Sequence, residues 1–285
     1  MGKAEYLMSS YFSKLNDCGK IGRVHSTFTH SFNLIVAGRL IHITDSDNYL
    51  SSFGLRIPKE MFRKIMNFCK DDDIVKITDE TLIFYSYQGV KIVSLKSIRK
   101  VPLEIINLSY DNQSVELLTK KLKSYELDKQ LGIENTRQNQ KYFEQLIQPE
   151  YSNQKWVEAL IFFIGRGRGL TPSGDDILLG YLFILSIYQH PAVKQIQEIL
   201  LNGLTTTTII SENYLRTAVQ GFVSSPFIQL NQWFMYPVPE KLDVVLKNIL
   251  AIGHTSGRDT AYGILLGVIM LSNEKINLGL NDKNN

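Results

Sequence analysis

Alternating apolar and polar residues in the first third of the chain predict β-strands. From Arg23 to Val36 most apolar residues share one parity and the polar residues share the other, which is the period of a half-buried strand. Ala37 and Gly38 predict a turn into a second strand over residues 40–43. Three further strands are expected at residues 74–78, 81–87 and 90–95.

A short amphipathic helix is expected between these strands, from Pro58 to Cys69. After Pro102 the strand period is lost, and apolar residues recur at helical spacing. Helices are expected at residues 109–132, 138–148, 154–164, 175–189, 192–204, 212–223, 240–252 and 258–272, with loops at 205–211 and 224–239. The expected fold class is therefore α+β: residues 1–106 form a mostly antiparallel sheet or small barrel, and residues 107–285 form an all-helical domain.

The composition is that of a globular protein, because 285 residues that are 44% apolar are enough for two cores. The 31 basic and 28 acidic residues are interspersed and form no basic stripe, which argues against nucleic acid as a partner. Cys18 and Cys69 form no CxxC or Cys/His cluster, so we expect neither a disulfide framework nor a zinc site.

The expected location is the cytoplasm, with no membrane partner. Charged residues run through the N-terminus and leave no continuous apolar core for a signal peptide. The two most apolar helical segments are shorter than the roughly 18 residues that span a bilayer.

Candidate chemistry is concentrated in Gly165-Arg-Gly-Arg-Gly-Leu-Thr-Pro-Ser-Gly-Asp-Asp176, which interrupts the most apolar part of the chain. Apolar segments at residues 156–164 and 177–188 flank this loop, so we expect it to lie in the interior. A similar pattern follows later: Ser173, Gly174, Asp176 and Gly180 recur with the same spacing as Ser256, Gly257, Asp259 and Gly263. We expect the two loops to lie together, with Asp176 and Asp259 within about 10 Å across a shared cleft, roughly the separation of packed helices.

Each motif has two interpretations. A serine three residues before an acid is the pattern of a capping box, in which Ser173 or Ser256 accepts a backbone amide and the acid reaches back. Alternatively, the glycines leave amides open to a ligand, and a buried carboxylate needs a partner. Gly180 and Gly263, one turn further on, would clear space beside the carboxylates.

As a ligand site, the helix N-termini at Gly174 and Gly257 favour a small anion, and arginines lie nearby. The aspartates could accept amide hydrogens, act as acid or base, or hold a divalent metal such as Mg²⁺. His254 is the best candidate for a general acid or oxyanion donor. The candidate catalytic residues are Asp176, Asp259 and His254, and the candidate substrate-binding residues are Gly169, Thr171, Ser173, Gly174, Asp175, Thr255, Ser256, Gly257, Arg258, Arg168, Thr206 and Thr207.

Two further groups of polar residues are weaker candidates. The connection from Thr205 to Ser211 is rich in hydroxyl groups, and Ser211 is expected to cap the next helix, although plain packing of β-branched residues is equally open. His25 and His30 have odd spacing on the predicted strand, so they would face opposite sides and form no metal pair.

The two motif loops, with the Thr206–Ser211 stretch between them, resemble the AllH-like proteins, formerly described as a domain of unknown function. The similarity extends more weakly to His25-Ser26 and to residues 53–58. The resemblance implies one of three kinds of subunit of an oxamate carbamoyltransferase in anaerobic allantoin degradation, a form of purine catabolism. The implied ligands are phosphate, oxamate, oxalurate and carbamoyl phosphate, and the implied partners are the other carbamoyltransferase subunits.

Two other functions stay open. One is a non-catalytic subunit or scaffold whose glycine motifs only hold a small anion. The other is a metal-dependent hydrolase that uses Asp175, Asp176 and Asp259.

Overall fold

The computed structural model describes residues 5–14, 20–134, 136–148, 150–151 and 153–281; Cys18 lies outside these ranges. The chain divides into two compact units. The first contains residues 1–104 and 222–225, and the second contains residues 105–221 and 226–285. The sequence pattern predicts a boundary after residue 106 and places the short return segment, residues 222–225, in the helical part.

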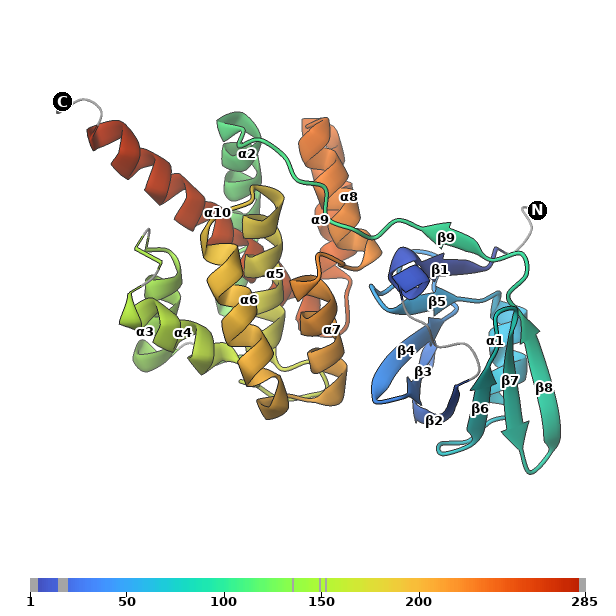
Figure 1. The fold of residues 1–285 in the computed structure, drawn as a ribbon. Coiled ribbons are helices and arrows are strands. Elements are labelled where there is room, and N and C mark those ends of the chain that lie inside the picture. Colours follow the sequence, from blue (N-terminus) through green and yellow to red (C-terminus); the bar gives the residue numbers. More distant parts are fainter. Residues whose placement is uncertain (1–4, 15–19, 135, 149, 152, 282–285) are drawn as a thin grey trace. The chain divides into compact units, whose positions relative to one another are not determined.

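Within the described residues, the first unit is a curled sheet of nine strands in the order β8-β7-β6-β2-β3-β4-β5-β1-β9 (Figure 1). Most neighbouring strands are antiparallel, but β4 pairs with β5 and β1 with β9 in parallel. The expected fold class is confirmed. The strands are β1 (Leu7–Ser9), β2 (Ile21–Thr27), β3 (Ser31–Val36), β4 (Arg39–Thr44), β5 (Gly54–Arg56), β6 (Ile74–Ile77), β7 (Thr81–Ser86), β8 (Gly89–Ser94) and β9 (Arg99–Val101).

The single strand expected from Arg23 to Val36 is wrong, because the chain turns back between β2 and β3. The Phe28 N–H donates to the Ser31 carbonyl at 2.8 Å and closes this turn. The alternation of apolar and polar residues continues through the turn, so the sequence pattern conceals it. His30 lies in the turn, where its Nδ1 is 3.2 Å from Asp45 Oδ1.

The expected turn between β3 and β4 is confirmed. Ala37 and Gly38 have φ values of 49° and 77°, which suits the type I′ turn that joins twisted antiparallel strands. By contrast, no sequence pattern predicts β1, β5 and β9. Each has three residues, too few for an alternating pattern to stand out.

The core of the first unit lies between the inner face of the sheet and helix α1 (Lys59–Met66). Phe62 and Ile65 of α1 belong to one buried cluster with strand residues such as Leu34 and Phe84. Burying each such side chain stabilises the fold by roughly 1.5–3 kcal/mol. Pro58 precedes α1 as expected, since its fixed φ suits the entry to a helix.

The second unit is helical. The helices are α2 (Asn112–Lys123), α3 (Arg137–Leu146), α4 (Gln154–Phe163), α5 (Ser173–Ile187), α6 (Ala192–Gly203), α7 (Ile209–Val219), α8 (Ser225–Met235), α9 (Pro239–Leu250) and α10 (Ser256–Asn281), with 3-10 helices η2 (Leu127–Lys129) and η3 (Leu204–Thr206). A further 3-10 helix, η1 (Ser10–Lys14), lies in the first unit. Helix α8 replaces much of the loop expected at 224–239. Its second residue is Pro226, and proline is compatible with a first turn because the amide there needs no helical partner.

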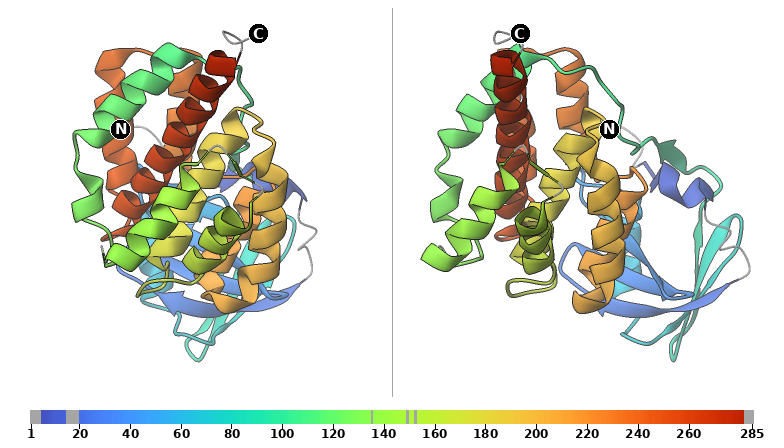
Figure 2. Two further views of the ribbon diagram at one scale, coloured as in Figure 1. Left: turned by 90° about the vertical axis from the view of Figure 1, so that its left-hand side faces the viewer. Right: turned by 60° about the vertical axis from the view of Figure 1, so that its left-hand side comes forward.

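Helices α5 and α10 lie side by side at the centre of this unit (Figures 1 and 2). Every residue of α5 except Ser186 is buried. A Cβ added to Gly263 would lie 1.9 Å from the Ile177 carbonyl oxygen, and one added to Gly180 would lie 2.1 Å from the Thr260 carbonyl oxygen. The two glycines therefore do not clear space beside the carboxylates, because the backbone of the opposite helix fills it.

We predict that Gly263→Ala destabilises the protein by about 1–3 kcal/mol, because its Cβ would meet rigid backbone. The melting temperature should fall by several degrees, at roughly 2–4 °C per kcal/mol for a chain of this size. Gly267→Ala, on the same helix, is the matched control. Its Cβ would lie 3.2 Å from Ile184 side-chain atoms, which can shift, and 3.4 Å from the Tyr181 carbonyl oxygen, an ordinary van der Waals contact. Equal thermal denaturation midpoints for the two variants would contradict the close approach of the helices.

Candidate functional site

The two motif loops meet at the first turns of α5 and α10. Thr171 Oγ1 and Ser256 Oγ are 2.7 Å apart and form a hydrogen bond that joins the loops. The expectation that the loops lie together is therefore confirmed. The carboxylates behind them are buried, however: the exposed fraction is 7% for Asp176 and 0% for Asp259. They lie in packed protein and not along an open cleft.

Asp176 receives hydrogen bonds from the side chains of Ser256 and Thr171, which favour its charged form. Burial has the larger effect and raises the pKa of Asp176 well above its usual range, and the nearby charges of Asp259 and Asp175 add to the rise. Among the described residues, Asp176 Oδ2 has no hydrogen-bond partner. Asp176 is thus a carboxyl group that holds its proton more tightly than a free aspartate does.

Asp259 has a corresponding environment. Burial raises its pKa, while hydrogen bonds from the Gly132 N–H, Ser173 and Thr255 and the charge of Arg258 oppose the rise. The Gly132 N–H donates to Asp259 Oδ1 at 3.0 Å. The other oxygen, Oδ2, has no partner in the described part of the chain.

The serine of each motif therefore lies beside the carboxylate of the other motif. The threonine of its own loop and the serine of the opposite loop both lie beside each carboxylate and favour its charged form. The capping-box interpretation does not fit α5: its N-cap is Pro172, which makes no side-chain cap bond, and Ser173 lies in the first turn. The motif serines thus interact with the other motif and do not form a capping box with the acid of their own helix.

Asp175 has a different role, because both of its oxygens are paired. Oδ1 accepts from the Gly165 N–H at 2.7 Å, and Oδ2 accepts from the hydroxyls of Thr207 and Ser211. Burial raises its pKa, and these three donors oppose the rise. Asp175 thus ties three segments together. Ser211 is not the helix cap expected from the sequence; Thr208 caps α7 by accepting from the Ser211 N–H at 3.1 Å.

The expectation that the whole first loop lies in the interior is wrong. Residues 166–170 are exposed, although the helices on either side are apolar. Gly165, Gly167 and Gly169 all have positive φ, which lets the chain leave the core and return within a few residues. The exposed members of the candidate set are Arg168, Gly169, His254 and Thr206.

The arginines near the loops are partly held by the chain itself. The Arg166 guanidinium lies 4.2 Å from the centre of the Phe162 ring. Arg258 Nη1 donates to the His254 carbonyl oxygen at 3.1 Å and so braces the second loop. Thr206 donates to the Gly203 carbonyl at 2.7 Å.

The two glycine amides expected to bind an anion are paired within the chain. Gly174 N–H donates to the Arg166 carbonyl at 2.8 Å, and Gly257 N–H donates to the Ile252 carbonyl at 2.9 Å. A Cβ added to Gly174 would lie 2.0 Å from the Phe163 carbonyl oxygen. Close backbone approach therefore accounts for Gly174 without a ligand.

A metal centre built from the three aspartates is not favoured by the geometry. Among the described residues, no three His, Cys, Asp or Glu side chains are grouped so that they could hold a metal ion. Cys69 is a free thiol, and burial raises its pKa to about 12.

Gly132 is a site residue that the sequence analysis missed. It is exposed, yet its N–H reaches the buried Asp259, and a Cβ added to it would lie 2.1 Å from Ser173 Oγ. The sequence analysis had ended a predicted helix at this glycine. Its distance along the chain from either motif left no signal of the contact.

Two family models match the chain. The AllH family N-terminal domain matches residues 3–97, and the oxamate carbamoyltransferase subunit AllH matches residues 163–268. The chain belongs to the AllH family. The AllH match begins at the end of α4 and includes both motif loops, whereas Gly132 lies outside it. No solved structure matches the chain.

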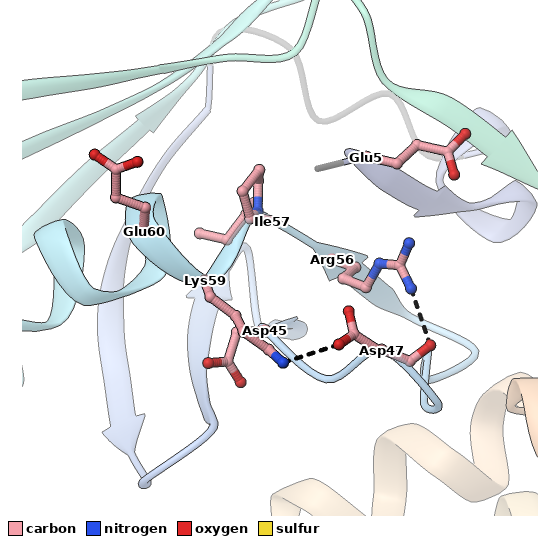
Figure 3. Close-up of a pocket in the computed structure, with 8 residues that line it drawn as sticks. Glu5, Asp45, Asp47, Arg56, Ile57, Lys59 and Glu60 are labelled. Atoms are coloured by element: carbon pink, nitrogen blue, oxygen red, sulfur yellow. Dashed lines mark hydrogen bonds and ion pairs between the residues drawn. The ribbon is translucent and has the colours of Figure 1, made fainter. Parts of the chain in front are cut away.

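In the part of the chain that matches the AllH N-terminal domain, a cavity of about 240 Å³ is lined by Glu5, Asp45, Asp47, Arg56, Ile57, Pro58, Lys59 and Glu60 (Figure 3). Its charges largely pair with one another. Lys59 Nζ is 2.8 Å from Asp47 Oδ2, and Arg56 donates to the Asp47 carbonyl at 3.0 Å. Because these contacts already engage both cations of the lining, we assign the cavity no ligand.

We predict that Asp176→Asn changes how stability depends on pH. A carboxyl whose pKa is raised by folding stabilises the protein at low pH, and this contribution is lost as pH rises from about 4 through the folded pKa. The melting temperature of the variant should therefore fall less than that of the wild type across this range. Parallel curves, measured by thermal denaturation at a series of pH values, would show that burial does not perturb Asp176.

Asp243→Asn is a control of opposite sign for this experiment. A hydrogen bond from Lys121 lowers the pKa of Asp243. Its small contribution should be present at neutral pH and disappear as pH falls.

We predict that Asp175→Asn destabilises the protein more than Asp176→Asn does. The side-chain amide of asparagine would place an NH2 donor where the carboxylate now accepts from three donors. One buried hydrogen bond would be lost, and the group that donates it would be left unpaired. Such a loss costs about 1–3 kcal/mol. Chemical denaturation of both variants at one pH tests the order, and a smaller loss for Asp175→Asn would remove its assignment as a structural tie.

Proposed function

We propose that this chain is a subunit of an oxamate carbamoyltransferase and that its motif loops contribute to a site for small anions. The observation that carries the proposal is the AllH match over residues 163–268, because that span contains both loops. Within the described residues, no helix is both long and apolar enough to cross a membrane. The same proposal places the protein in the cytoplasm and assigns it to anaerobic allantoin degradation.

The proposed reaction interconverts oxalurate plus phosphate with oxamate plus carbamoyl phosphate. An oxygen of hydrogen phosphate attacks the ureido carbonyl carbon, and the bond from that carbon to the oxamate nitrogen breaks. The proton of the phosphate ends on the departing nitrogen, so atoms and charge balance. This chemistry needs seats for two anions, donors for the developing oxyanion and a group that can pass a proton.

Residues on two levels of the motif loops suit these needs. The exposed level carries Arg166, Arg168 and His254, which can meet phosphate or a carboxylate from solvent. The buried level holds Asp176 and Asp259, each with a raised pKa and with one oxygen that has no partner among the described residues. A carboxyl with a raised pKa holds its proton to higher pH than a free aspartate and can act as the acid for the departing nitrogen.

A scaffold function for this subunit is the second candidate. The observation that favours it is the complete burial of Asp259 together with the pairing of the Gly174 and Gly257 amides inside the chain. Under this alternative the motif aspartates only hold α5 and α10 together, and the chemistry belongs to other subunits.

We predict that Asp176→Asn and Asp259→Asn abolish phosphate-dependent oxamate release by the reconstituted complex. Asparagine keeps the shape of the side chain but removes its charge and its proton, so melting temperatures should stay within a few degrees of wild type, a change on the scale of about 1 kcal/mol. Asp79→Asn, on an exposed turn, is the control and should keep full activity.

The opposite pattern would favour the scaffold. If both variants unfold at lower temperature yet keep full specific activity when assembled in the cold, the aspartates act only in folding.

A further inference from the structure

The outer face of strands β2, β3, β6, β7 and β8 is largely apolar, and no element among the described residues of the first unit covers it. Strand register places residues that face the same side in rows, because directly opposed residues of antiparallel strands share a face. One row runs Val90, Tyr85, Ile74, Arg23 and Ile35, and the next runs Ile92, Ile83, Lys76 and Ile21. We call these nine residues the outer rows. Several are well exposed: Ile21 by 66%, Ile92 by 59% and Val90 by 56%.

The other face of the same strands is the core already described. Val75, Phe84 and Val93 are buried there against α1. Figure 1 shows α1 on one side of β7 and β8 only. Among the described residues of its own unit, the sheet therefore has a covered inner face and a bare outer face.

The sequence of these strands is that of a sheet covered on both sides. An antiparallel sheet with one face in water normally alternates apolar and polar residues. Strand β7 instead reads Leu82-Ile-Phe-Tyr85, and apolar residues on β6 and β8 likewise point to both faces. Contiguous exposed apolar surface of this kind marks interaction sites in proteins.

We propose that the outer rows are the surface by which this chain docks onto another protein subunit of the same assembly. The family is described as a subunit of an oxamate carbamoyltransferase, so its members associate with other chains. Identifying the partner in this way rests on the proposed function. The only charged residues in the outer rows are Arg23 and Lys76. The partner surface is therefore apolar with carboxylates placed to meet these two cations.

The test is association of the full-length chain with the other carbamoyltransferase subunits. The variant Val90→Lys/Ile92→Lys places two cations on the outer rows at an edge strand, where lysine is well tolerated. Its melting temperature should stay within a few degrees of wild type, and its affinity for the partner subunits, measured by interferometry, should fall at least tenfold. Val244→Lys on α9, at a residue that is 61% exposed, is the matched control and should bind normally.

A second variant tests the charges separately. Lys76→Glu keeps the apolar residues but reverses one cation, so it should weaken association severalfold, and the difference from wild type should shrink as salt is added. Unchanged binding by this variant would overturn the predicted carboxylates on the partner.

Other occupants give different results. Normal binding by Val90→Lys/Ile92→Lys would overturn the proposal. Crosslinks from Ile92→Cys to the helical unit of the same chain, or to a second copy of the chain, would also overturn it. A double variant that binds the partner subunits normally and loses only its binding to anionic phosphatidylserine vesicles would overturn it as well. If the wild-type assembly forms but produces no oxamate, while the double variant fails to assemble, the proposed function is wrong and the docking surface stands.

Discussion

The helical unit depends on the contact between the backbones of α5 and α10. Gly180 and Gly263 bring each helix against a carbonyl of the other, at a distance that excludes any side chain. This contact aligns the first turns of both helices, and the alignment places the hydroxyl groups of one motif beside the carboxylate of the other. A site made of buried carboxylates tolerates little displacement, because each lost donor leaves a charge in a medium that solvates it poorly.

The three motif aspartates differ although they lie close together, and their partners explain the difference. Asp175 has a donor for every oxygen and joins the two ends of the first loop to α7. Asp176 and Asp259 each keep one oxygen without a partner in the described part of the chain, and burial favours their neutral forms. Burial of this kind serves a purpose when a group has to carry a proton, and is a cost when it serves stability alone.

The sequence predicts the elements well where one period runs without interruption. Strands β6 to β8 and helices α4 to α6 follow this rule. It fails where the period continues through a turn, as at Phe28, and at residues 225–235, where α8 lies in an expected loop. It also fails for the burial of the first loop. Apolar helices on either side do not determine whether a glycine-rich loop between them lies in the interior or at the surface. The pairing of the motifs is visible as a repeat, but the Gly132 contact is not, since it depends on tertiary packing alone.

The contacts between the two motifs also constrain how the chain folds during its synthesis. Asp176 and the glycine face of α5 leave the ribosome long before Ser256, Thr260 and α10 exist to receive them. During that interval an almost wholly apolar helix carries a carboxylate with no partner from the second loop, a state prone to aggregation. The helical unit can therefore reach its final packing only after the last helix is synthesised. A nascent chain cut short within α9 would lack half of its central helix pair, so the cell has reason to shield α5 until translation ends.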